Sequence, residues 1–179
     1  MNEKKKLEES RYFLSKMEQA QDETFEFECN LSAFLSASRS VLQYAHAEAK
    51  KTRSGLQWYE STVNREPILE FFKDKRNINI HQQPISPSAK TKIGIHGTVN
   101  ISASISVVVK DKDGNIKNEY HSKPNQTPTK MKPPETTKTV TYYFSDWTGD
   151  EDVITLCKKY LDKLEKLVND RIRQGHISG

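Results

Sequence analysis

An arginine, an amide and a histidine lie within six residues in the stretch Arg76-Asn77-Ile78-Asn79-Ile80-His81. Histidine titrates near neutral pH, so it can take the proton from a 2′-hydroxyl or donate one to a leaving oxygen. Arginine can hold a phosphate by paired hydrogen bonds and stabilise the charge that develops on it. An amide can orient the phosphate or the imidazole. Arg76, Asn77 and His81 are therefore the candidate catalytic residues, and the chemistry they suggest is metal-free cleavage of RNA.

Helical geometry limits which of these side chains can meet. The stretch from Pro67 to His81 reads as a helix that begins on a proline, has an apolar first half and ends in polar residues. At about 100° per residue, Asn77 and His81 lie about 40° apart and share a face, whereas Arg76 and His81 lie about 140° apart and do not. A site that uses both is easier to build where the helix end relaxes, or where two copies of the chain meet around one phosphate.

A purely structural interpretation of the same residues is a polar helix end. Arg76 would then pair with Glu70 or Asp74, and His81 would cap the terminal carbonyls. This interpretation needs no ligand, so the partner of Arg76 distinguishes it from a catalytic site.

Other basic residues are expected to be surface or satisfied polar groups. The run Lys4 to Lys6 suggests a solvated helix face, with nucleic-acid binding as the alternative. Arg39 and His46 are expected not to be ligands. His96 and His121 could meet across a sheet, but they have no third ligand nearby in the sequence, so no metal site and no cofactor are predicted.

Apolar residues of helical period predict four helices around the motif. The second is rich in small residues, which let neighbouring helices approach closely, so it is expected at the centre of a bundle. Ser54-Gly55 is expected to break the second helix before the third begins. Thr148-Gly149-Asp150-Glu151 fits a capping box for the last helix. The predicted helices cover residues 3–21, 24–51, 56–82 and 149–173, and within 56–82 Pro67 is expected either to begin a renewed helix or to kink a continuing one.

Between the third and fourth helices the period changes to two. Apolar residues occupy odd positions from Ile93 to Val109, which predicts strands with one buried face and a break near Gly97 to Asn100. Asp111 to Gly114 predicts a hairpin turn, followed by a returning strand at 115–122.

A loop and one more strand complete this region. Four prolines between Lys123 and Glu135 predict an exposed loop. The next strand, 136–144, carries Val140, Tyr142 and Phe144 on one face. The order predicts an α+β fold, a four-helix bundle with an antiparallel β-meander inserted before the last helix. The chain is expected to be a single domain, 1–179, with its helical core at about 3–82 and 148–173 and its β insertion at about 90–145.

The composition suits a soluble, mildly basic protein of 179 residues, with 34% hydrophobic residues and a net charge of +4. No run approaches the roughly 18 apolar residues of a membrane span, and the N-terminus does not resemble a secretory signal. The expectation is a cytoplasmic protein without a membrane partner. Cys29 and Cys157 lie in helical patterns and are expected to be buried thiols. No glycine-rich phosphate loop is present, which disfavours a nucleotide-dependent enzyme.

The arginine and histidine of the motif, with polar Asn77 beside the arginine, resemble the motif of the HEPN superfamily. The predicted helical bundle also fits, over roughly residues 5–82 and 148–173, with the β-meander as an elaboration. The resemblance implies an α-helical domain, often dimeric, in a superfamily with many RNA-cleaving toxins and defence nucleases but also members that are not nucleases. On this resemblance Arg76 and His81 are the catalytic pair and Asn77 is their polar neighbour.

Two function hypotheses follow. The first is a metal-independent endoribonuclease or RNA-binding protein that acts through Arg76 and His81, with a homodimer as its expected state and an antitoxin or other protein as a further partner. The alternative is a non-catalytic interaction or scaffold protein with the same fold, which binds its partner through the sheet or the proline-rich loop.

Overall fold

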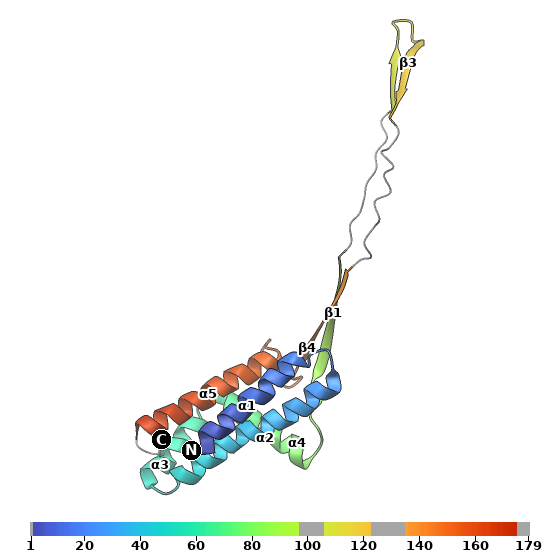
Figure 1. Cartoon of the computed structure of the whole chain (residues 1–179). Coiled ribbons are helices and arrows are strands. Elements are labelled where there is room, and N and C mark those ends of the chain that lie inside the picture. Colours follow the sequence, from blue (N-terminus) through green and yellow to red (C-terminus); the bar gives the residue numbers. More distant parts are fainter. Residues whose placement is uncertain (1, 97–105, 123–134, 175–179) are drawn as a thin grey trace. The chain divides into compact units, whose positions relative to one another are not determined.

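The computed structural model describes residues 2–96, 106–122 and 135–174, and this part of the chain is α+β, with five helices and four strands (Figure 1). The chain divides into two compact units, residues 1–92 with 139–179, and residues 93–138. None of the described helices is long and apolar enough to cross a bilayer. The helices are α1 (Asn2–Gln19), α2 (Thr24–Ala49), α3 (Arg53–Val63), α4 (Pro67–His81) and α5 (Val153–Arg173), and the strands are β1 (Ser88–His96), β2 (Ser106–Lys110), β3 (Ile116–His121) and β4 (Glu135–Tyr143).

Helix α2 is the centre of the first unit, as its small residues predicted. It packs against each of the other four helices, and α1 and α5 run alongside it (Figure 1). The apolar residues that recur with the helical period in α2 are buried, and they belong to one hydrophobic core shared with α1, α4 and α5. They are Leu31, Phe34, Leu35, Leu42, Ala45 and Ala49.

Of the two alternatives for Pro67, a renewed helix is confirmed, because residues 53–81 form two helices, α3 and α4. Pro67 begins α4, where its missing N–H costs no helical hydrogen bond. Helix α3 begins at Arg53, so the predicted break at Ser54-Gly55 is wrong. Thr52 caps the helix by accepting from the backbone N of Gly55 at 3.1 Å. A Cβ on Gly55 would lie 2.6 Å from the carbonyl oxygen of Ala49, so this glycine permits a close approach between the first turn of α3 and the end of α2.

The last predicted helix is confirmed as α5, with its apolar residues buried in the core, but the predicted cap is wrong. Helix α5 begins at Val153, and the side chain of Asp152 accepts from the backbone N of Thr155 at 2.9 Å. The capping box at Thr148 to Glu151 is therefore wrong. Glu151 instead pairs with Lys159 at 2.5 Å, and this hydrogen bond is the main cause that lowers the pKa of Glu151 to about 2.

Arg171 is a fully buried charge near the end of α5. Its Nη1 donates to the carbonyl of Ala45 at 2.9 Å and its Nη2 to that of Gly55 at 3.3 Å. The guanidinium also lies 4.4 Å from the centroid of the Trp58 ring. Burial lowers the pKa of Arg171, and the nearby Glu48 acts in the opposite direction. One side chain thus joins α5 to both α2 and α3.

The four strands form two separate two-stranded sheets rather than the predicted meander. Strand β1 pairs with β4, and β2 pairs with β3 in an antiparallel hairpin. The hairpin turn lies at Asp111 to Gly114 as predicted, and Gly114 supplies the positive φ of 85° that it requires. The predicted break at Gly97 to Asn100 and most of the proline-rich loop lie outside the described residues.

The predicted buried face of residues 93–109 is wrong for its described members. Ile93 is 63% exposed and Ile95 71%, while Val107 and Val109 are 48% and 42% exposed. The alternation of apolar and polar residues indicates that the apolar side chains share a face. A face is buried, however, only if a second layer covers it. The described residues of the second unit form no second layer.

Strand β4 buries Val140 and Tyr142, and Phe144 just beyond it, as predicted. The ring of Tyr142 stacks on Phe27 of α2, with centroids 3.8 Å apart. The Tyr142 hydroxyl donates to the carbonyl of Gln21 at 3.1 Å, so the end of β4 is fixed to the connection between α1 and α2.

The two cysteines differ in exposure. Both are free thiols, but only Cys157 is buried, so the prediction was wrong for Cys29. Cys29 lies away from the apolar stripe of α2, and its helical surroundings alone did not place it in the core. Burial raises the pKa of the Cys157 thiol well above its ordinary value.

We expect one thiol of the folded protein to react rapidly with a chromogenic disulfide reagent and the second only after unfolding, because the thiolate is the nucleophile. Cys29→Ser should remove the rapid phase, which is measured by absorbance in native buffer and again in denaturant. A rapid phase that persists in folded Cys29→Ser protein would contradict the burial of Cys157.

Candidate functional site

The candidate site lies at the C-terminal end of α4, and the apolar first half of this helix fixes its place. Ile68, Leu69 and Phe72 are buried in the core. The ring of Phe72 stacks on Tyr160 of α5, with centroids 4.3 Å apart and planes 3° from parallel, and meets Phe34 of α2 edge to face at 6.2 Å. Helix α4 is therefore held against both α2 and α5 one turn before the motif begins.

Lys75, immediately before Arg76, turns inward and provides a second attachment. It is only 8% exposed. Its Nζ lies 2.5 and 2.7 Å from the two carboxylate oxygens of Asp146, and about 5 Å from the ring centroids of Phe71 and Phe144. Because Lys75 faces the protein, Arg76 is turned about 100° away from that inward direction around the helix.

Arg76 and His81 meet at the end of α4, although their helical positions differ by about 140°. Nη1 of Arg76 lies 3.5 Å from Nε2 of His81, at the outer limit of a hydrogen bond. His81 is the last residue of the helix, and the long arginine side chain covers the separation. An arginine only donates, so Nε2 of His81 must accept and the proton of a neutral imidazole sits on Nδ1.

The carboxylates expected in a purely structural interpretation do not pair with Arg76. None of the ion pairs in the described chain joins Arg76 to Glu70 or Asp74. Nε of Arg76 is buried and has no hydrogen-bond partner in the described chain, so this arginine interacts through its terminal nitrogens. Asn77 is half-buried and makes no hydrogen bond to Arg76 or His81. The structure thus brings together two of the three predicted site residues.

Two residues that support the motif were missed by the sequence analysis. In the sequence alone, nothing distinguishes Lys75 from the other lysines, or Asn79 from the other asparagine of the motif. Asn79 is hydrogen-bonded to Ser32 of α2 and to the backbone of Ile85. The signal that could have found them is their spacing, since positions four apart on a helix share a face and buried Phe72 marks the inward side.

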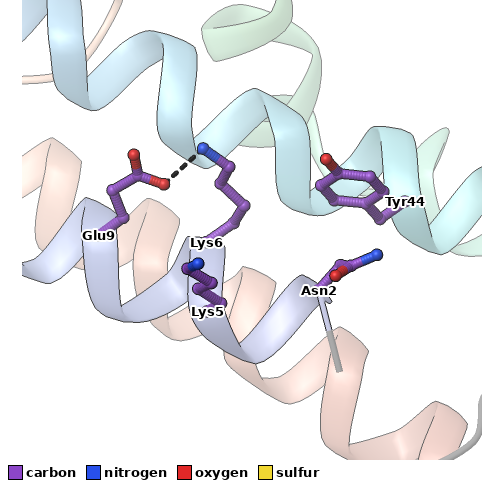
Figure 2. A pocket seen from close by; sticks show the side chains of 5 residues that line it. All are labelled: Asn2, Lys5, Lys6, Glu9 and Tyr44. Carbon is purple, nitrogen blue, oxygen red and sulfur yellow. Dashed lines mark ion pairs between the residues drawn. The ribbon is translucent and has the colours of Figure 1, made fainter.

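A hollow between α1 and α2 is lined by Asn2, Lys5, Lys6, Glu9 and Tyr44 (Figure 2). Its volume is about 540 Å³. Lys6 pairs with Glu9 at 2.5 Å, and Lys5 is exposed, as expected of a solvated helix face. These lining residues include no histidine, so the hollow does not offer the arginine–histidine pair of the α4 site.

The two histidines considered for a metal belong to different sheets, because His96 ends β1 and His121 ends β3. His121 instead lies 3.2 Å from Glu119. Within residues 2–96, 106–122 and 135–174, no group of three or more histidine, cysteine or acidic side chains could hold a metal ion.

Comparison of the chain with protein-family models, with curated proteins and with solved structures gave no significant match. Function is therefore inferred from the motif, its geometry and the helices that hold it.

We expect Lys75→Met to lower the free energy of unfolding by about 1–2 kcal/mol, because it removes a charge-assisted hydrogen bond whose lysine is buried but whose aspartate is half exposed. Lys73→Met, on the same helix and without an ion pair in the described chain, should change it by less than about 0.5 kcal/mol. Denaturant titration measures both. Equal effects of the two substitutions would contradict the attachment assigned to Lys75.

Proposed function

We propose that this chain is a HEPN-like, metal-independent RNA-cleaving or RNA-binding protein that acts through Arg76 and His81. The observation that carries the proposal is the 3.5 Å approach of Nη1 of Arg76 to Nε2 of His81 at the end of a helix that is packed on two others. A donor of fixed positive charge beside a group that moves protons is what phosphodiester cleavage without a metal requires.

The proposed reaction uses the pair in sequence. Phosphate oxygens take the donors of Arg76, which frees the Nε2 lone pair of His81. That nitrogen removes the proton of a neighbouring 2′-hydroxyl, the 2′-oxygen forms a bond to phosphorus, and the bond from phosphorus to the 5′-oxygen breaks. The leaving oxygen takes a proton from water or from a second histidine. The products are a 2′,3′-cyclic phosphate and a 5′-hydroxyl.

A homodimer belongs to the same proposal. A single Arg76–His81 pair supplies one histidine, whereas acid and base catalysis of this reaction use two proton-transfer groups. A second copy would bring a second pair to the same phosphate. A further protein partner that restrains the activity, such as an antitoxin, would act by covering this helix end.

We expect the wild-type protein to cleave single-stranded RNA in the presence of EDTA, and Arg76→Ala and His81→Ala to reduce the rate by about 10²-fold or more, since each removes one catalytic function. Gel analysis of labelled RNA measures the rate, and circular dichroism confirms folding of each variant.

The matched controls are Arg173→Ala and His46→Ala, which remove the same side-chain types from exposed positions elsewhere on the helices. Both should retain the wild-type rate. Equal cleavage by the wild type, both site variants and both controls would refute the assignment of the site.

An interaction or scaffold protein is the second candidate function, and the hairpin of β2 and β3 favours it. Val107, Val109 and Tyr120 share one face of this hairpin by its register, and all three are more than 40% exposed. An apolar face of this kind is typical of a surface that binds another protein. On this alternative, RNA is not cleaved and the Arg76–His81 pair is dispensable.

A further inference from the structure

Asn79, in the middle of the motif, joins three segments of the chain. Its Nδ2 donates to Oγ of Ser32 on α2 at 2.8 Å. Its Oδ1 accepts from the backbone N of Ile85 at 3.1 Å, six residues further along the chain. Both partners lie outside α4, so the amide ties the last turn of this helix to α2 and to the segment that follows the helix.

The direction of the Asn79 amide is fixed by its partners. The backbone N–H of Ile85 can only donate, so the atom facing it must be the amide oxygen. The amide nitrogen is then the atom that faces Ser32, whose hydroxyl oxygen accepts. Each side of the amide therefore has one well-formed hydrogen bond, and Asn79 cannot rotate without losing both.

The segment closed by this amide contains His81. Gln82 and Gln83 both donate to the carbonyl of Ile78 at 3.0 Å, so the chain leaves α4 directly after His81. The hydrogen bond between Asn79 and Ile85 closes the helix end around that exit. Without it, the last turn would be free to fray, as helix ends without partners do.

From this geometry we propose that Asn79 is a positioning residue that holds the imidazole of His81 against the guanidinium of Arg76. It does not touch the substrate, and it acts through the backbone that carries His81. Lys75 lies four residues earlier on the same inward face. Its hydrogen bond to Asp146 holds the turn of α4 that carries Arg76. The functional meaning of this arrangement rests on the proposed function, but the arrangement itself can be tested without activity.

The test compares Asn79→Ala with Asn79→Asp in the full-length chain. Alanine removes both hydrogen bonds. Aspartate keeps both, because one carboxylate oxygen accepts from Ile85 and the Ser32 hydroxyl can turn to donate to the other. The primary readout is the tautomer of the neutral His81 ring, read from long-range ¹H–¹⁵N correlations, with His81→Gln used to assign the signals among the five histidines.

The wild type should show the proton on Nδ1 of His81, because Arg76 can only donate to Nε2. Asn79→Ala should lose this preference for the tautomer protonated on Nδ1, and Asn79→Asp should keep it. In cleavage assays, Asn79→Ala should lower kcat by about 10²-fold, the cost of a misplacement of about 1 Å, with a smaller change in KM.

An unchanged His81 tautomer in folded Asn79→Ala protein would overturn the proposal, and so would an equal loss of the preference in Asn79→Asp. Unchanged kcat in Asn79→Ala would do the same. A wild type that cleaves no RNA would refute the proposed cleavage alone, because the ring signals of the two Asn79 variants still decide whether this residue positions His81.

Discussion

The stacking of Phe72 on Tyr160 is the contact on which the candidate site depends. These rings are buried, parallel and 4.3 Å apart, and Phe34 closes the cluster edge to face, so α2, α4 and α5 meet at one point of the core. Arg76 follows Phe72 by four residues, a little more than one turn. The position of the motif is therefore set by aromatic packing in the core and not by the polar residues of the motif.

Three inward residues, in successive turns of α4, hold this helix in place. Phe72 packs in the core, Lys75 pairs with Asp146, and Asn79 bonds to α2 and to the chain beyond the helix. Their spacing of three and four residues keeps them on one face. Arg76 and His81 lie outside this inward face, and the ends of their side chains approach to 3.5 Å. A helix held in this way can present two polar side chains to solvent without either one contributing to the core.

The helices could be predicted because their apolar residues recur with the helical period and their neighbours cover them. Other features depended on tertiary surroundings. The alternation around Ile93 and Val107 showed which side chains share a face, but not that the face is exposed. The angle between Arg76 and His81 on a helical wheel suggested separation, because a wheel places Cβ atoms and not the ends of long side chains. The partners of Asn79 and Arg171 lie tens of residues away or beyond a helix end, so no local pattern could have revealed them.

The most direct test of the account is the chemistry of the ends that the protein leaves on RNA in the presence of EDTA. Attack by the 2′-oxygen, assisted by Arg76 and His81, predicts a 2′,3′-cyclic phosphate and a 5′-hydroxyl, absent when His81→Ala replaces the wild type. Mass spectrometry of a short RNA, with a 2′-deoxy copy as the uncleavable control, identifies these ends. A 3′-hydroxyl and a 5′-phosphate, or cleavage of the 2′-deoxy copy, would contradict the mechanism.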